Sequence, residues 1–144
     1  HFPKDKIIKK TQDVLKMVGL EAFADYYPDQ LSASMLQRVS IARAFAVEPD
    51  LLLMDEPYGQ LDVELRFKLE DELLRIWQET KTTIIFITHN IEEAVYMSKR
   101  IMVLTNKPTK VKEDFENPLP LPRSVTEESF VAMRNKVTDM IKWW

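Results

Sequence analysis

The stretch LLLMDEP, residues 51–57, decides the fold class of this chain. Four apolar residues in a row are typical of a strand that is buried on both faces of a parallel sheet. The strand would deliver Asp55 and Glu56 at its carboxyl end, which is the edge where ligands of open parallel sheets bind. A carboxylate pair by itself more often caps a turn. With a strand before it and Pro57 after it, we interpret the pair as a candidate site.

The two carboxylates suit different tasks in phosphoryl transfer. Asp55 could hold Mg²⁺ through water, because this ion binds few protein carboxylates and keeps several waters. Glu56 could orient and deprotonate an attacking water. His89 directly follows the β-branched run 82–88, so we expect it at the same sheet edge, where it could contact a terminal phosphate. A loop histidine is usually only solvated, but its place after a strand favours the functional interpretation.

Helical and strand patterns alternate on both sides of this stretch. The predicted helices cover residues 4–17, 33–48, 64–80, 90–99 and 126–144, and the predicted strands cover residues 51–54, 82–88 and 101–104. Strand–helix alternation predicts an α/β fold with a parallel sheet and flanking helices. Residues 107–123 contain four prolines and predict a linker. We therefore expect three parts: a helical segment 1–48, a sheet-bearing core 49–106, and a linker with a terminal helix 107–144.

Composition narrows the class of protein. The chain has 144 residues, of which 45% are hydrophobic and 30% charged, as in a globular domain. A net charge of -3 argues mildly against nucleic-acid binding, which favours a basic face. The sequence has no cysteine, which excludes disulfides and thiolate metal sites. No apolar run is long enough to cross a bilayer, so any membrane role would be peripheral.

Four motifs together resemble the ATP-binding subunit of ABC transporters. Residues 31–44, LSASMLQRVSIARA, resemble the signature motif and its helix, and residues 51–57 resemble Walker B with the catalytic glutamate. Residues 58–62, YGQLD, resemble the D-loop, and residues 88–90, THN, resemble the switch-histidine loop. The motifs occur in the family's order. The resemblance implies part of a P-loop NTPase-type sheet with flanking helices and part of the helical subdomain.

The resemblance assigns roles to individual residues. It implies that Asp55 supports Mg²⁺, that Glu56 is the general base and that His89 contacts the γ-phosphate of ATP. Asp62 would couple the two halves of a dimer. The residues that would lie on the ATP of the opposite subunit are Ser32, Ala33, Ser34 and Met35. A helix N-terminus suits that task, because it presents amide donors and a positive dipole end to an anion.

A narrower resemblance concerns the kind of transporter. The segments 72–77, 90–95 and 119–123 are similar to ATPases of nitrate, sulfonate and taurine importers. This likeness implies an ATPase that energises uptake of such an anion. Its partners would be a second ATPase subunit and a transmembrane permease, and nucleic acid would not be one. It would lie in the cytoplasm, peripheral to the inner face of the cell membrane.

The chain departs from the family pattern at two places. The phosphate loop GxxxxGK[ST] is absent, since Gly19 is followed by leucine and Gly59 by glutamine. We therefore expect the chain to be the C-terminal part of such a subunit and inactive as an ATPase by itself, with ATP and Mg²⁺ bound weakly or not at all. Ala33 and Ser34 stand where the signature has glycines, whose bare backbone permits close approach to a phosphate.

Three further expectations follow from the same residues. The altered signature leaves open a non-catalytic partner or regulatory module, although such a module would not need both Glu56 and His89. A related ATPase of chromosome maintenance or DNA repair is the third reading. The compact helical stretch before residue 31 disfavours it, because those proteins insert long coiled coils there.

A sheet without all its strands exposes edges and apolar faces, so we expect the isolated chain to dimerise or exchange strands.

Overall fold

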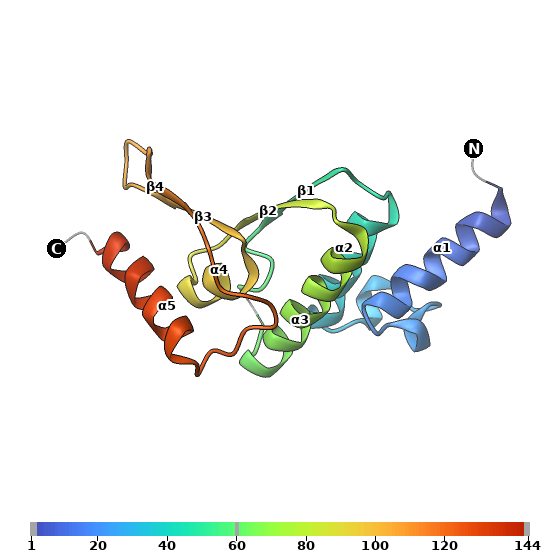
Figure 1. The fold of residues 1–144 in the computed structure, drawn as a ribbon. Coiled ribbons are helices and arrows are strands. Elements are labelled where there is room, and N and C mark those ends of the chain that lie inside the picture. The colour runs from blue at the N-terminus through green and yellow to red at the C-terminus, as the bar shows by residue number, and fades with distance from the viewer. Residues whose placement is uncertain (1–2, 60, 143–144) are drawn as a thin grey trace. The chain divides into compact units, whose positions relative to one another are not determined.

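The structure is a computed structural model that describes residues 3–59 and 61–142. Its elements are α1 (Lys4–Met17), η1 (Glu21–Phe23), η2 (Pro28–Gln30), α2 (Ala33–Ala46), β1 (Leu51–Asp55), α3 (Val63–Thr80), β2 (Thr83–Ile87), α4 (Ile91–Met97), β3 (Arg100–Leu104), β4 (Val111–Glu116) and α5 (Glu128–Ile141) (Figure 1). The predicted α/β class is confirmed, and every predicted helix and strand is present. The chain divides into two compact units, which meet in sequence between Ile85 and Phe86. The three-part division 1–48, 49–106 and 107–144 stays a prediction.

Helices α1 and α2 pack on each other in the first unit. Gly19 ends α1 in the left-handed region, with φ of 64°, and the Leu20 amide turns back to the Leu15 carbonyl over 2.8 Å. Glycine adopts this conformation without the steric cost that a Cβ brings. From α2, Arg38 Nη1 donates to the Val18 carbonyl over 3.1 Å. The end of the first helix is therefore tied to the middle of the second.

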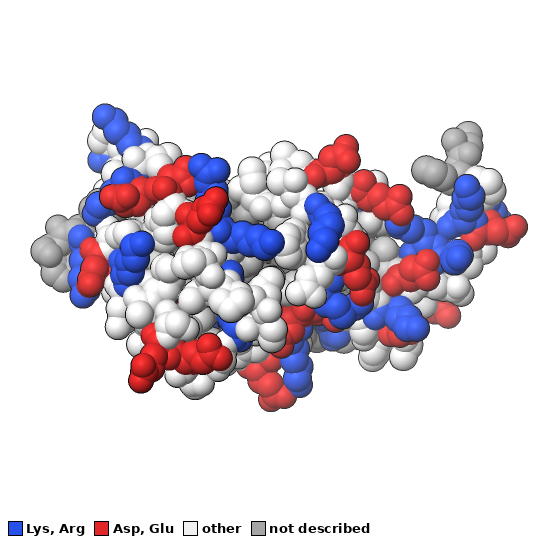
Figure 2. All heavy atoms as spheres, viewed as in Figure 1, with Lys and Arg blue, Asp and Glu red and all other residues white. Residues whose placement is uncertain are grey.

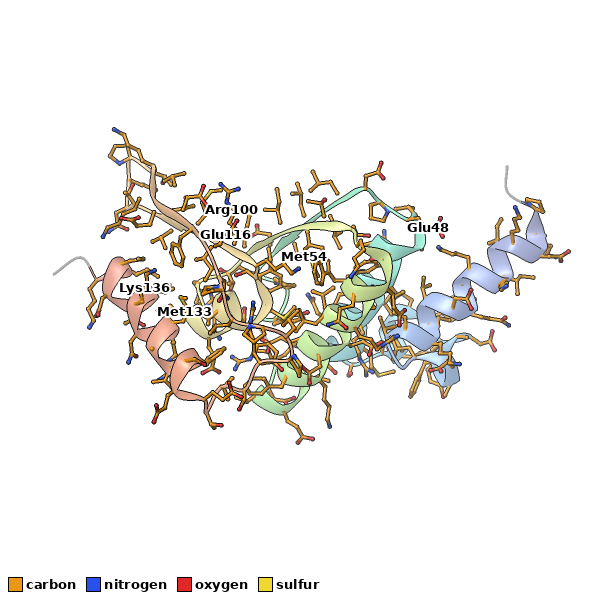
Figure 3. All side chains as sticks on the ribbon, viewed as in Figure 1. Glu48, Met54, Arg100, Glu116, Met133 and Lys136 are labelled. Atoms are coloured by element: carbon orange, nitrogen blue, oxygen red, sulfur yellow. The ribbon has the colours of Figure 1, made fainter. Side chains whose placement is uncertain are left out.

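Strand β1 is buried on one face only. Leu52 and Met54 are buried, whereas Leu51 and Leu53 are 51% and 66% exposed. Met54 lies on the side of β1 that faces α3 (Figure 3). The prediction of a strand buried on both faces is therefore wrong for the residues that the structure describes. The physical reason is that the described residues pack against one face of the sheet that β1 forms with β2 and leave the opposite face open.

The uncovered face of β1 and β2 is apolar. Ile85 of β2 is 48% exposed, close to the value for Leu51. The upper middle of the surface in Figure 2, over these two strands, is mostly free of charged side chains. Exposed apolar faces were expected for an incomplete sheet. Dimerisation or strand exchange through them stays a prediction.

The second unit differs from the expected parallel sheet. Strand β3 pairs antiparallel with β4, with Arg100 opposite Glu116 and Ile101 opposite Phe115. The predictions that residues 101–104 form a third parallel strand and that residues 107–123 form a linker are therefore both wrong. The segment 111–116, VKEDFE, offers only a weak strand pattern because four of its six residues are charged. Its pairing with β3 supplies the stability that local propensity does not.

Two contacts fix this hairpin and its helix. The Arg100 guanidinium donates to both carboxylate oxygens of Asp114, each over 2.7 Å. Helix α5 contacts both α4 and β3, and Lys136 of α5 lies 4.4 Å from the centre of the Phe115 ring (Figure 3). No helix among residues 3–59 and 61–142 is long and apolar enough to span a bilayer.

Candidate functional site

The turn after β1 carries the two candidate carboxylates. Asp55 is the last residue of β1, and both Asp55 and Glu56 are exposed. Glu56 has a φ of 48°, in the left-handed region that costs a residue with a Cβ about 1 kcal/mol or more. Its carbonyl accepts from the Gly59 amide over 3.3 Å, and a Cβ built on Gly59 would lie 3.7 Å from Glu56 Oε2. The glutamate carboxylate therefore folds back over a glycine, where the backbone leaves space for it.

Hydrogen bonds to two helices hold this turn in place. Tyr58 is 2% exposed and donates through its hydroxyl to the Leu69 carbonyl of α3 over 3.4 Å. From α2, Gln37 Nε2 donates to the Pro57 carbonyl. The helix that begins at the signature motif therefore contacts the residue next to Glu56. Neither Gln37 nor Tyr58 was predicted as a site residue, because each bond joins positions at least 11 residues apart.

Asp62 caps helix α3. Its Oδ1 accepts from the Leu65 amide over 2.9 Å, which satisfies one of the amides that a helix start leaves without a partner. Gln60, inside the motif that resembles the D-loop, lies outside the described residues. The cap accounts for the presence of an aspartate at this position. The coupling role of Asp62 stays a prediction.

Two variants of Asp62 separate its cap from its charge. We expect Asp62→Ala to lower the free energy of unfolding by about 1 kcal/mol, the usual cost of losing an N-cap acceptor. Asp62→Asn should stay within about 0.5 kcal/mol of the parent, because its amide oxygen can still accept from Leu65. Urea unfolding followed by circular dichroism measures both. Equal losses in the two variants would contradict this account of the cap. Because Asp62→Asn keeps the cap of α3, this variant can test whether the charge of Asp62 couples the two halves of a dimer.

The signature segment forms the start of helix α2. Ser32 is the N-cap, and its Oγ accepts from the Met35 amide over 3.3 Å. The hydroxyls of Ser32 and Ser34 lie 3.1 Å apart, so one donates to the other. Ser32 and Ala33 are exposed, and Ser34 and Met35 are half-buried. An anion at this helix start would therefore meet a pair of hydroxyls as well as the first amides of the helix.

His89 lies in the second unit, in the turn between β2 and α4. Its side chain is exposed, and both neighbours are held. Thr88 Oγ1 accepts from the Asn90 amide over 3.0 Å, and Asn90 Oδ1 accepts from the Glu92 amide over 2.9 Å. The predicted capped start of this helix at Asn90 is confirmed. Because Glu56 belongs to the other unit, the meeting of Glu56 and His89 at one sheet edge stays a prediction.

Asp55 suits a magnesium ion whose other ligands are oxygens of the nucleotide phosphates and of water. Within the two described ranges, no group of three or more His, Asp or Glu side chains is placed to hold a metal. Mg²⁺ in nucleotide sites uses one or two carboxylates, with phosphates and water as the other ligands. An exposed aspartate at the end of a strand meets that requirement. Asp55 therefore remains the proposed magnesium residue.

Comparison with known proteins points to one family. Residues 4–59 match the family model described as ABC transporter. An uncharacterized ABC transporter ATP-binding protein of Methanocaldococcus jannaschii is 46% identical over 98% of this chain and 53% of its own length. An aliphatic sulfonates import ATP-binding protein of Bacillus cereus is 48% identical over 93% of this chain and 54% of its own length. The chain spans about half the length of the curated relatives it matches.

Solved structures agree with the sequence relatives. The dimeric structure of a bacterial ABC transporter cassette superposes with a TM-score of 0.69 and 33% identity, covering 81% of this chain and 50% of that one. The structure of cbiO1 from Clostridium perfringens, part of the ABC transporter complex cbiONQ, gives a TM-score of 0.73 at 28% identity. It covers 95% of this chain and 52% of that one. The chain therefore shares the fold of ABC transporter cassettes over most of its length.

Proposed function

Because this chain belongs to the ATP-binding proteins of ABC transporters, we propose that it forms the signature and carboxylate part of an ATP-hydrolysing importer subunit. The observation that carries the proposal is the turn after β1. It presents Glu56 at the end of a strand and is held from α2, the helix of the signature segment, through Gln37. A carboxylate that only capped a turn would not need the bond from α2.

The proposed chemistry assigns one step to each group. Glu56 accepts a proton from the water that attacks the γ-phosphate of ATP. His89 donates a hydrogen bond to that phosphate and thereby fixes its orientation. A magnesium ion held through Asp55 would neutralise charge on the phosphate oxygens. The protein's contribution is positioning and charge stabilisation, since phosphoryl transfer itself needs little covalent chemistry from the enzyme.

The start of α2 serves a different nucleotide. In this proposal Ser32, Ala33, Ser34 and Met35 face the ATP held by a second ATPase subunit, and Asp62 couples the two halves. The hydroxyls of Ser32 and Ser34 take the place of the close backbone approach that glycines would allow. The similar bacterial cassette was solved as a dimer, which supports the proposal that two such subunits associate.

The remaining partners follow from the importer relatives. We assign the chain to the cytoplasmic face of a cell membrane, bound peripherally to a transmembrane permease. The transported solute would be a small anion such as a sulfonate, nitrate or taurine, and the named sulfonate importers favour the first. Nucleic acid has no place in this function.

These 144 residues do not contain the motif GxxxxGK[ST]. Without it, no lysine offsets the charge of the β- and γ-phosphates and no backbone loop surrounds them. We therefore assign Glu56 and His89 to a site that residues outside this chain complete. By itself the chain would be inactive.

A non-catalytic partner or regulatory module is the second candidate, and the altered signature at Ala33 and Ser34 favours it. The two candidates differ in the whole protein that carries this chain together with a phosphate loop. Steady-state release of phosphate from MgATP by that protein supports the ATPase. A protein that binds MgATP through its phosphate loop and shows no turnover, alone or with its permease, would support the module instead.

A further inference from the structure

A buried carboxylate binds both neighbours of His89. Glu93 is 5% exposed, in the first turn of α4. Its Oε2 accepts from Thr88 Oγ1 over 2.6 Å, and its Oε1 accepts from Asn90 Nδ2 over 3.3 Å. The backbone amide of Asn90 completes this network by donating to Thr88 Oγ1 over 3.0 Å. The residues before and after His89 are therefore held to one another and to the same side chain.

This arrangement restricts the backbone of His89 and leaves its side chain exposed. A buried carboxylate needs hydrogen-bond donors, and here two of them come from the residues that flank the histidine. The threonine hydroxyl donates and accepts at the same time, so its rotamer is fixed by both bonds. Bonds that share atoms in this way reinforce one another. These bonds therefore limit the backbone conformations that are open to His89.

Side-chain hydrogen bonds also hold the C-terminal end of α4. Asn117 Nδ2 donates to the Val95 and Ser98 carbonyls over 2.9 and 3.0 Å. Arg123 Nη1 donates to the same two carbonyls and to that of Tyr96, over 2.7–2.9 Å. A helix of seven residues is too short to be stable by itself. Anchored at its last turn, α4 becomes a fixed base from which Glu93 holds the His89 turn.

We propose that Glu93 is a positioning residue for His89, acting through Thr88 and Asn90. Glu93 orders the turn that carries the imidazole, so that the entropy cost of ordering this loop is not added to the barrier for hydrolysis. The catalytic part of this inference rests on the proposed function of His89. The structural part, that Glu93 orders the His89 turn, stands on the hydrogen bonds alone.

Nuclear magnetic resonance on this chain tests the structural part. The sequence has only two histidines, so a His1→Gln background leaves His89 as the single imidazole. In Glu93→Gln we expect the backbone amide of Asn90 to exchange with solvent about tenfold faster or more, because Thr88 Oγ1, which accepts from that amide, loses the carboxylate that fixes its rotamer. The His89 ring signals should move toward those of a flexible histidine. Glu128→Gln is the matched control, because Glu128 is also acidic in a first helical turn but is exposed.

A second pair of variants keeps the test decisive if Glu93→Gln does not fold. Thr88→Ser retains the hydroxyl and should preserve both readouts, whereas Thr88→Val removes it and should show the same losses as the glutamate variant. Unchanged Asn90 exchange and His89 signals in folded Glu93→Gln, or in Thr88→Val, would overturn the inference.

Turnover of the whole ATP-binding protein tests the catalytic part. We expect Glu93→Gln to lower kcat and to leave the KM for ATP within about twofold, because the histidine acts after nucleotide is bound. If the His89 signals lose their order and kcat does not change, the role proposed for His89 in hydrolysis fails while Glu93 still orders the turn. The two failures are therefore distinguishable.

Discussion

Replacement of Glu56 by glutamine is expected to lower ATP turnover of the whole ATP-binding protein by at least about 100-fold, the usual contribution of a general base. The amide cannot accept the proton of the attacking water, although it has nearly the same shape as the carboxylate. Because Glu56 is exposed at the end of β1, the substitution should leave the fold and the affinity for MgATP unchanged. Phosphate release and nucleotide binding, measured on the same preparation, separate these effects.

The chain offers a matched control for this experiment. Glu48 is also an exposed glutamate in the left-handed region, with φ of 49° against 48° for Glu56. It pairs with Lys10 of α1, and that bond lowers the pKa of its carboxyl. Glu48→Gln should leave turnover within about twofold, since surface substitutions away from a site have small effects. Equal losses at positions 48 and 56 would contradict the assignment of Glu56 as the general base.

Replacement of Arg123 by methionine is expected to cost about 3 kcal/mol of unfolding free energy, because hydrogen bonds from a charged donor are strong and the Tyr96 and Leu119 carbonyls would lose their side-chain donor. The residue is 7% exposed and donates to the Val95, Tyr96, Ser98 and Leu119 carbonyls. Burial lowers the pKa of Arg123 from its usual range. Carbonyl dipoles at the end of α4 stabilise its positive charge. Methionine fills similar space but donates no hydrogen bond.

Urea unfolding followed by far-ultraviolet circular dichroism measures this loss. Arg75→Met is the control, because Arg75 forms ion pairs with Glu72 and Glu79 on the exposed surface of α3. We expect the control to change stability by less than about 1 kcal/mol, as surface ion pairs do. Similar losses of unfolding free energy in both variants would show that the contacts of Arg123 with α4 stabilise the fold no more than a surface ion pair does.

Features that depend on neighbouring residues could be predicted from the sequence. The run 51–54 identified β1, and Asn90 with Glu93 identified the start of α4, because strand composition and helix caps are local patterns. The family motifs at 31–44 and 88–90 also lie within single elements or turns. The placement of the candidate residues at element ends, Glu56 after β1 and His89 after β2, was therefore predicted correctly.

Features that depend on distant partners could not be predicted. Strand β4 forms because β3 pairs with it, and its own charged sequence gives little sign of a strand. Three of the four carbonyls that accept from Arg123 lie 25 to 28 residues earlier in the chain, and Arg123 itself follows a run of prolines that suggested a linker. Gln37 reaches the Pro57 carbonyl 20 residues away. No local pattern encodes such contacts, since they arise only when the elements pack.

The most direct test of the proposed function is MgATP binding and hydrolysis by these 144 residues alone, beside the same chain with Glu56→Gln. The absence of a phosphate loop from the sequence predicts neither saturable binding nor turnover in either preparation. Glu56 and His89 would then belong to a site that other residues complete. Turnover by the parent chain that disappears in Glu56→Gln would contradict this account, because the chain would then form a complete phosphate site by itself.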